Sequence, residues 1–314
     1  MNTNKTRPFF VLGLPNSATS TVVGIVNSHP EILVCYETWM LPPRVTQYTT
    51  RVCNVFPEIR KVFSGTLEIP DAYIKMGEIV AQHGIQYKYI GDKMVSFTLE
   101  EMQMLADASV LYIVRPLAEW LIKREVRRTY NTDLDTVVPA LHYLRCLTFA
   151  NSKPNWLRVS MQAMMDHPEE FIFKTAKYLG LDPNDFDRNW WKSLEHYSDP
   201  LKNSMGWAKA HPSSLMPPQH RPDITYQLKN HPFWIDVKNI EKELFSKIEV
   251  GISEAEKEEL TVRIQSISDK YTIIPIRDLY SDLQENRHTP IPLKSQGFLR
   301  TFRDTLPIFK SWLK

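Results

Sequence analysis

Short apolar runs, each followed by polar or turn residues, are the clearest pattern along the first part of the chain. Four such runs occur, at 9–12, 32–35, 87–90 and 110–114. Runs of this length without alternating polar residues are typical of strands that are buried on both faces, as in a parallel sheet. We therefore predict a strand at each of them.

Apolar residues at helical spacing mark several of the segments between and after these runs. The expected helices lie at 19–28, 134–150 and 168–179, with another that begins near Leu117. Gly180 follows the third of them, and glycine is a common helix terminator. Strands that alternate with helices predict an α/β fold, a three-layer sandwich around a central parallel sheet.

The later part of the chain changes character twice. Prolines are frequent from 200 to 235, so we expect irregular structure there and consider it a candidate lid over a pocket, whereas 236–285 returns to helical patterns. Residues 286–314 combine six basic residues and one acidic residue with a mostly helical apolar stripe. We divide the chain into a domain at 1–285 and a basic amphipathic tail at 286–314. The tail is expected to dock on its own domain or on a sister subunit of a homo-oligomer, with membrane-surface contact as the alternative.

Composition narrows the possible functions. The chain has 314 residues, 43% of them hydrophobic and 24% charged, with a net charge of +2, which is typical of a soluble globular protein. A nucleic-acid binder would need a clustered excess of basic residues, so we expect no nucleic-acid partner. The three cysteines form no C-x-x-C pair and the nine histidines have no zinc-binding spacing, so we expect no disulfide framework and no metal. The reduced cysteines and an N-terminus unlike a signal peptide favour a cytoplasmic location, and we expect no membrane span.

The segment after the first predicted strand has the character of an anion-binding loop. It reads Gly13-Leu14-Pro15-Asn16-Ser17-Ala18-Thr19-Ser20 and leads into a predicted helix. Backbone N–H groups at such a junction bind anions, although taken alone the loop suits a simple helix N-cap equally well. Against the Walker pattern G-x-x-x-x-G-K-[ST], Ala18 replaces the second glycine and Thr19 replaces the lysine. An ATPase or ordinary kinase is therefore disfavoured.

These residues resemble a known family. A strand, then G-x-P-[RK]-S-G-T-T, a helix and S-H-P-E is the pattern of sulfotransferases that use 3′-phosphoadenosine 5′-phosphosulfate (PAPS) and release 3′-phosphoadenosine 5′-phosphate (PAP). The loop matches at Gly13, Pro15, Ser17 and Thr19, with Ser20 in place of Thr. The resemblance implies a P-loop-like phosphosulfate-binding loop. Two positions depart from the family, since Asn16 replaces the usual Arg or Lys and Ala18 replaces Gly.

Other matched segments imply catalytic and donor-binding residues. The motifs are nearest to the branch of tyrosylprotein and heparan sulfotransferases, in which a glutamate after the second strand is the general base, and Glu37 matches it. Lys93 in Gly-Asp-Lys matches a lysine near the scissile bond. Arg115 matches the arginine that binds the 3′-phosphate, and Lys123 stands where the family has a second phosphate ligand. Ser198 is similar to a later donor-binding serine.

The resemblance implies a PAPS-dependent sulfotransferase that acts by in-line displacement without a metal. We expect a small-molecule acceptor with a hydroxyl or an amine, because the chain shows no secretory signal. Two alternatives stay open. One is a different P-loop nucleotide-binding enzyme. The other is a binding protein without turnover, which would fit the departures at Asn16 and Ala18 and the altered motif at Arg115, where Pro116 follows directly instead of the family's R-D-P-R.

Overall fold

The structure is a computed structural model, and it describes residues 6–38, 47–63, 67–95, 97–120, 134–188, 201–202 and 232–271. The predicted sites Lys123 and Ser198 lie outside these ranges, as do most of the candidate lid and the whole basic tail. Those predictions remain untested.

A five-stranded parallel sheet forms the centre of the protein, which confirms the predicted α/β class. The strands are β1 (Arg7–Leu12), β2 (Ile32–Tyr36), β3 (Tyr89–Met94), β4 (Ser109–Val114) and β5 (Trp156–Ser160). Their order in the sheet is β2-β3-β1-β4-β5, and every neighbouring pair is parallel. The four predicted strands are confirmed, and β5 was missed because Arg158 interrupts its apolar residues.

The third strand differs from the prediction in its position. The apolar run at 87–90 suggested a strand that stops before Gly91, but β3 runs from Tyr89 to Met94 and contains Asp92 and Lys93. Both polar side chains are buried. The strand continues because it lies between β2 and β1, where ladder hydrogen bonds on both sides outweigh the low strand propensity of Asp and Lys.

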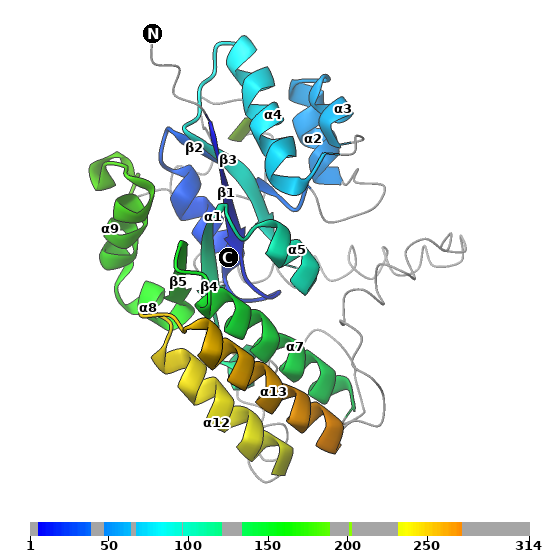
Figure 1. Cartoon of the computed structure of the whole chain (residues 1–314). Coiled ribbons are helices and arrows are strands. Elements are labelled where there is room, and N and C mark those ends of the chain that lie inside the picture. Colours follow the sequence, from blue (N-terminus) through cyan, green and yellow to red (C-terminus); the bar gives the residue numbers. More distant parts are fainter. Residues whose placement is uncertain are drawn as a thin grey trace, which may run out of the picture.

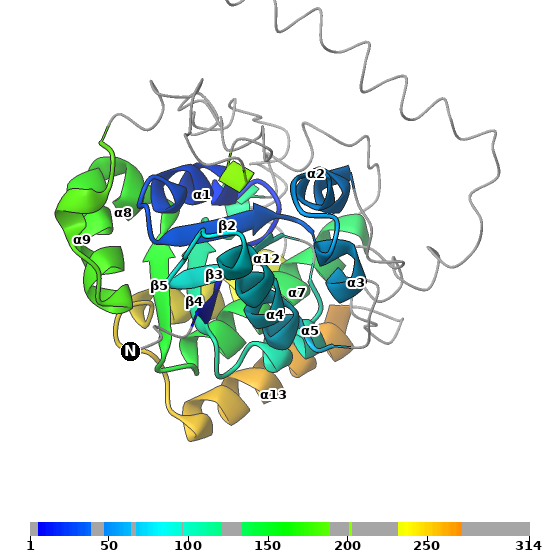
Figure 2. The same ribbon diagram turned by 90° about the horizontal axis from the view of Figure 1, so that it is seen from above.

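Helices cover both faces of the sheet (Figures 1 and 2). One face carries α1 (Thr19–Asn27), α8 (Met161–Asp166) and α9 (Pro168–Leu179), and the other carries α4 (Ile69–Gln82), α5 (Leu99–Met104) and α7 (Leu134–Asn151). This division follows from right-handed crossovers: the chain moves one way along the sheet from β1 to β2 and the opposite way through β3, β4 and β5.

Four of the remaining helices form two outer groups. Helices α2 (Gln47–Val55) and α3 (Ile59–Phe63) lie beside α4, and α12 (Pro232–Ser246) and α13 (Glu254–Tyr271) pack on α7 (Figure 1). A short 3-10 helix, η1 (Pro183–Asp185), follows α9. The predicted helices 19–28, 134–150 and 168–179 are confirmed, and a helix begins at Leu117 as expected. Helix α12 starts inside the segment predicted to be irregular, because a proline is well tolerated in the first turn of a helix.

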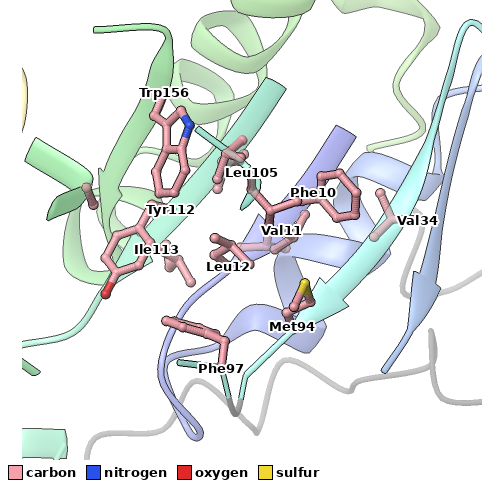
Figure 3. Packing of buried hydrophobic residues seen from close by; sticks show 14 of the residues in the cluster. Phe10, Val11, Leu12, Val34, Met94, Phe97, Leu105, Tyr112, Ile113 and Trp156 are labelled. Carbon is pink, nitrogen blue, oxygen red and sulfur yellow. The ribbon is translucent and has the colours of Figure 1, made fainter. Parts of the chain in front are cut away.

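The core lies on both sides of the sheet. Phe10, Val11 and Leu12 of β1 and Tyr112 and Ile113 of β4 are buried together in it (Figure 3). Such burial on both faces explains why the strands read as continuous apolar runs rather than as an alternation. The three cysteines are free and buried.

Two glycines allow the elements around the first strand to pack closely. A Cβ atom at Gly91 would lie 1.8 Å from the Phe9 carbonyl oxygen, and one at Gly13 would lie 2.5 Å from the Ile113 side chain. Neither contact is possible for a larger residue without a backbone shift. Gly13 therefore lets the loop after β1 run directly along the end of β4.

Candidate functional site

Four of the five strands, β1 to β4, bring the predicted site residues to the same end of the sheet. The loop from Gly13 follows β1, Glu37 follows β2, Lys93 lies near the end of β3, and Arg115 follows β4. The carboxyl ends of the strands in an open parallel sheet are the usual place for ligands. Residues that are separated by about a hundred positions in sequence are thus neighbours in space.

The loop between β1 and α1 has the backbone geometry of an anion site. Asn16 has φ 71° and Ala18 has φ 65°, both left-handed, with Ser17 between them. Alternation of this kind turns successive N–H groups toward one concavity. The Ser17 N–H is already used, since it donates to the Leu14 carbonyl at 3.1 Å.

Helix α1 leaves its first turn open to a ligand. Its N-cap residue is Ala18, which offers no side-chain hydrogen bond, and the first turn contains no acidic residue. The first N–H groups of a helix have no acceptor within the helix, and they carry the positive end of its dipole. An anion at this position would satisfy donors that the chain itself leaves uncapped.

In the part of the chain that the structure describes, left-handed backbone at residues other than glycine is confined to this site. Among the described residues, the non-glycine residues with positive φ are Asn16, Ala18 and Glu37, the last at 51°. Each such residue costs on the order of 1–3 kcal/mol, somewhat less for Asn, and persists only where its surroundings fix it. The strain is therefore concentrated where the predicted chemistry lies.

Lys93 and Glu37 form the central pair of the site. Lys93 Nζ lies 2.6 Å from Glu37 Oε1 and donates to Ser20 Oγ at 3.2 Å. The same ammonium lies 4.5 Å from the centre of the Tyr36 ring, whose hydroxyl donates to the Ser20 carbonyl at 3.1 Å. The Lys93 side chain is 6% exposed and that of Glu37 is 25% exposed. A cation from β3 thus reaches the loop at Ser20.

Arg115 lies under the loop. Its Nη1 donates to the Asn16 carbonyl at 2.9 Å, and Trp120 Nε1, one helical turn further on, donates to the Pro15 carbonyl at 2.6 Å. Arg115 is 1% exposed, and burial lowers the pKa of its guanidinium. Glu119 Oε2 lies 3.3 Å from Nη2 without hydrogen-bond geometry, and the buried Nε has no partner among the described residues.

A partly buried carboxylate supports the Arg115 segment from outside the sheet. Glu241 of α12 accepts from the backbone N–H of Leu117 at 2.5 Å, and Tyr143 of α7 donates to the Arg115 carbonyl at 2.8 Å. Burial raises the pKa of the Glu241 carboxyl. No motif predicts this contact, because Glu241 is 124 residues away from Leu117.

Lys202 takes a structural place in the fold. It follows the segment that contains the predicted Ser198, and its Nζ donates to the carbonyls of Asn27 and His29 at 2.8 and 2.7 Å. These carbonyls lie at the end of α1 opposite the loop, where a cation complements the helix dipole. The structure therefore keeps Lys202 away from the loop between β1 and α1.

The described residues contain neither a cluster of metal-ligating side chains nor a candidate membrane span. No group of three or more His, Cys, Asp and Glu side chains there is arranged to hold a metal ion. No helix in that part of the chain has both the length and the apolar character that a membrane span requires.

Comparison with known proteins identifies no family from the sequence but finds sulfotransferases among solved structures. No family model matches the chain, and no curated protein matches it. The sulfotransferase domain from the curacin biosynthetic pathway is 12% identical with a TM-score of 0.45, and the match covers 76% of this chain and 97% of that chain. The sulfotransferase domain from the Synechococcus PCC 7002 olefin synthase is 17% identical with a TM-score of 0.41, covering 88% and 98%.

A third similar structure is a mouse protein. The sulfotransferase SULT7A1, complexed with PAP, is 12% identical with a TM-score of 0.37, and the match covers 83% of this chain and 89% of that chain. At such identities and TM-scores these likenesses say nothing about individual residues. The chemistry of the site has to follow from the side chains and backbone of this chain.

Proposed function

We propose that the protein is a PAPS-dependent sulfotransferase that transfers a sulfuryl group to a hydroxyl or an amine of a small-molecule acceptor. The observation that carries this proposal is the Lys93–Glu37 pair beside the uncapped loop at α1, with 2.6 Å between Nζ and Oε1. A base, a cation and an anion-binding loop are the three parts that such a transfer needs. The motifs are nearest to the tyrosylprotein and heparan sulfotransferase branch.

The loop fits the anionic end of the donor. Its left-handed residues and the free first turn of α1 offer N–H groups to an anion, and Lys93 adds a positive charge at Ser20. We assign the 5′-phosphosulfate to residues Pro15 to Ser20, and the 3′-phosphate to Arg115 and Lys123, with Ser198 as a further donor contact. The buried Nε of Arg115, which has no hydrogen-bond partner among the described residues, supports its part of this assignment.

The donor, when bound, supplies an activated sulfuryl group on a phosphate leaving group. Glu37 takes the proton from the acceptor hydroxyl or amine as the new bond to sulfur forms. Lys93 and the loop N–H groups stabilise the negative charge that remains on the phosphate oxygen as its bond to sulfur breaks. No step needs a metal, and we propose a cytoplasmic enzyme.

The solvent exposure of Glu37 and Lys93 suits their roles as general base and as stabilising cation. Glu37 is partly open to solvent, so an acceptor can approach its carboxylate, whereas Lys93 is nearly enclosed between the loop and the Tyr36 ring. A cation with little water around it stabilises developing charge more strongly than an exposed one. The pair also keeps Lys93 pointed at the loop while the site is being filled.

The test is transfer from PAPS to a panel of hydroxyl and amine acceptors by wild type and by Glu37→Gln. We expect the variant to keep its affinity for PAP and to lose turnover by the ~10²- to 10⁴-fold typical of a missing general base. Glu78→Gln is the matched control, because Glu78 also pairs with a lysine, Lys75, at 2.7 Å, but on the exposed face of α4. Full turnover in Glu37→Gln would place the base elsewhere, and a wild type without transfer to any acceptor would contradict the proposed activity.

A further inference from the structure

A buried cluster of three polar side chains lies directly behind the Glu37–Lys93 pair. Thr38, Tyr73 and Asp92 are each fully buried. Asp92 Oδ2 accepts from Thr38 Oγ1 at 3.0 Å and from Tyr73 at 2.8 Å, and the two hydroxyls are also in contact with each other. The other carboxylate oxygen, Oδ1, accepts from the Lys93 backbone N–H at 2.8 Å.

The cluster joins three elements at the site. Thr38 follows Glu37 at the end of β2, Asp92 precedes Lys93 in β3, and Tyr73 comes from α4. The Tyr73 ring is fixed by edge contacts with Phe10 and Phe63 in the core. Each of the two reactive side chains therefore has a chain neighbour in the cluster.

A buried aspartate in a central strand needs an explanation. Asp has low strand propensity. Its carboxylate loses hydration when it is buried, and this loss is costly unless hydrogen bonds to protein groups replace the water. Burial and the Asp92 carboxylate raise the pKa of Tyr73 well above its ordinary value of 10, so the phenol stays a donor. Apolar side chains would fill the same space at lower cost. The cluster therefore has a purpose besides stability.

The backbone of Glu37 indicates what that purpose is. Its φ of 51° is left-handed, which a residue with a side chain keeps only when its neighbours hold it there. On one side the Glu37 N–H donates to the Lys93 carbonyl at 3.2 Å. On the other side Thr38 is held through its side chain by Asp92 and Tyr73.

We propose that Thr38, Tyr73 and Asp92 are positioning residues that hold Glu37 in the left-handed conformation and so place its carboxylate against Lys93. The catalytic consequence rests on the proposed function, whereas the conformational consequence does not. None of the three touches the reacting atoms. They act through the backbone of Glu37 and Lys93.

The test compares Thr38→Val, which removes the hydroxyl at nearly constant volume, with Thr38→Ser, which restores it. We expect Thr38→Val to lower kcat by ~10- to 100-fold, the cost of misplacing a catalytic group by about 1 Å, with KM for PAPS and Kd for PAP nearly unchanged. Thr38→Ser should recover most of the lost kcat. Thr175→Val is the control, because Thr175 is a buried hydroxyl in α9 that has no hydrogen-bond partner among the described residues.

Crystal structures of the same variants decide the conformational part without any activity assay. In Thr38→Val we expect Glu37 to leave positive φ and its contact with Lys93 to be lost, and in Thr38→Ser we expect both to be kept. A Thr38→Val structure with φ and contact intact would overturn the proposal. If wild type transfers no sulfuryl group and Thr38→Val still loses the geometry, the proposed function fails while the positioning role stands.

Tyr73→Phe is the second variant in case Thr38→Val does not fold. It keeps the ring that packs on Phe10 and Phe63 and removes only the hydroxyl. In this variant too, we expect Glu37 to leave positive φ and to lose its contact with Lys93. A folded Tyr73→Phe protein that keeps both the Glu37 geometry and the wild-type kcat would also overturn the proposal.

Discussion

The positive charge at the loop comes from a strand rather than from the loop itself. Lys93 of β3 reaches Ser20, while Asn16 occupies the place where similar loops carry Arg or Lys. Asn adopts the left-handed backbone of φ 71° more readily than Arg does. At this position the chain therefore favours backbone shape over a second charge.

Asn16→Arg should restore that second charge. Because a charge-assisted hydrogen bond is worth ~1.5–3 kcal/mol, we expect PAP to bind at least about tenfold more tightly at low salt, with the gain falling as salt screens it. Titration calorimetry at two salt concentrations measures this, and Asn16→Gln is the neutral control. Loss of binding by a folded Asn16→Arg protein would show that the loop cannot take a charged side chain at this position.

At the scale of elements, α12 supports the site from a distance. Glu241 accepts from the first N–H of the helix at Leu117, and Tyr143 of α7 holds the Arg115 carbonyl, so α12 and α7 together fix the end of β4. Arg115 in turn holds the loop at Asn16. A change in α12 therefore has a physical route to the loop.

Glu241→Gln should change how stability depends on pH. Burial raises the pKa of Glu241 above its ordinary value of 4.5, so the folded state binds more protons than the unfolded state between the two pKa values. Wild type should therefore lose stability, relative to Glu241→Gln, as pH rises above about 4.5, by up to ~1.4 kcal/mol for each pH unit inside that window. Urea unfolding of both proteins from pH 4 to 7 measures the difference.

If the difference in free energy of unfolding between wild type and Glu241→Gln stayed constant with pH, or changed with the opposite sign, this interpretation of Glu241 would be contradicted. Glu243→Gln on the same helix is the control for loss of a carboxylate, because Glu243 is partly exposed and pairs with Arg263 at 2.8 Å rather than with the backbone at Leu117.

The sequence predicted the elements better than it predicted their contacts. Four strands and the helix after β1 follow from apolar periodicity, and Glu37, Lys93 and Arg115 follow from motifs. The predicted extent of β3 was wrong because Asp92 and Lys93 are polar. Their hydrogen-bond partners Tyr73 and Ser20 come from other elements, so the sequence around β3 does not reveal them. Similarly, Trp120 and Glu241 reach the site only through packing. Local sequence carries no information on such pairings.

At the scale of the whole molecule, ligand binding should appear as added stability. PAP at a hundred times its Kd adds ~2.7 kcal/mol, which for a chain of this size is a rise in Tm of roughly 4 °C. We expect no rise with ATP and magnesium, since Thr19 replaces the Walker lysine, and a smaller one with a nucleotide that lacks the 3′-phosphate. Differential scanning fluorimetry measures all three.

Arg115→Ala should remove the advantage of PAP over the nucleotide without a 3′-phosphate. Equal shifts with PAP and with ATP and magnesium would favour a general nucleotide-binding protein instead. Equal losses for both adenosine ligands in Arg115→Ala would limit Arg115 to the contact with Asn16 that the structure already has.

The strand order also has a consequence during synthesis. The central strand β1 is made first, but its partner β3 extends to Met94, which pairs with Leu12. At about 5–20 residues per second, the apolar Phe9–Leu12 segment waits roughly 4–16 s for that neighbour. Non-local pairing of this kind is slow and leaves apolar backbone open to the wrong partners. We therefore expect the folding of the nascent chain to depend on ribosome-associated chaperones. We also expect the yield of folded protein to improve when the translation rate or the growth temperature is changed.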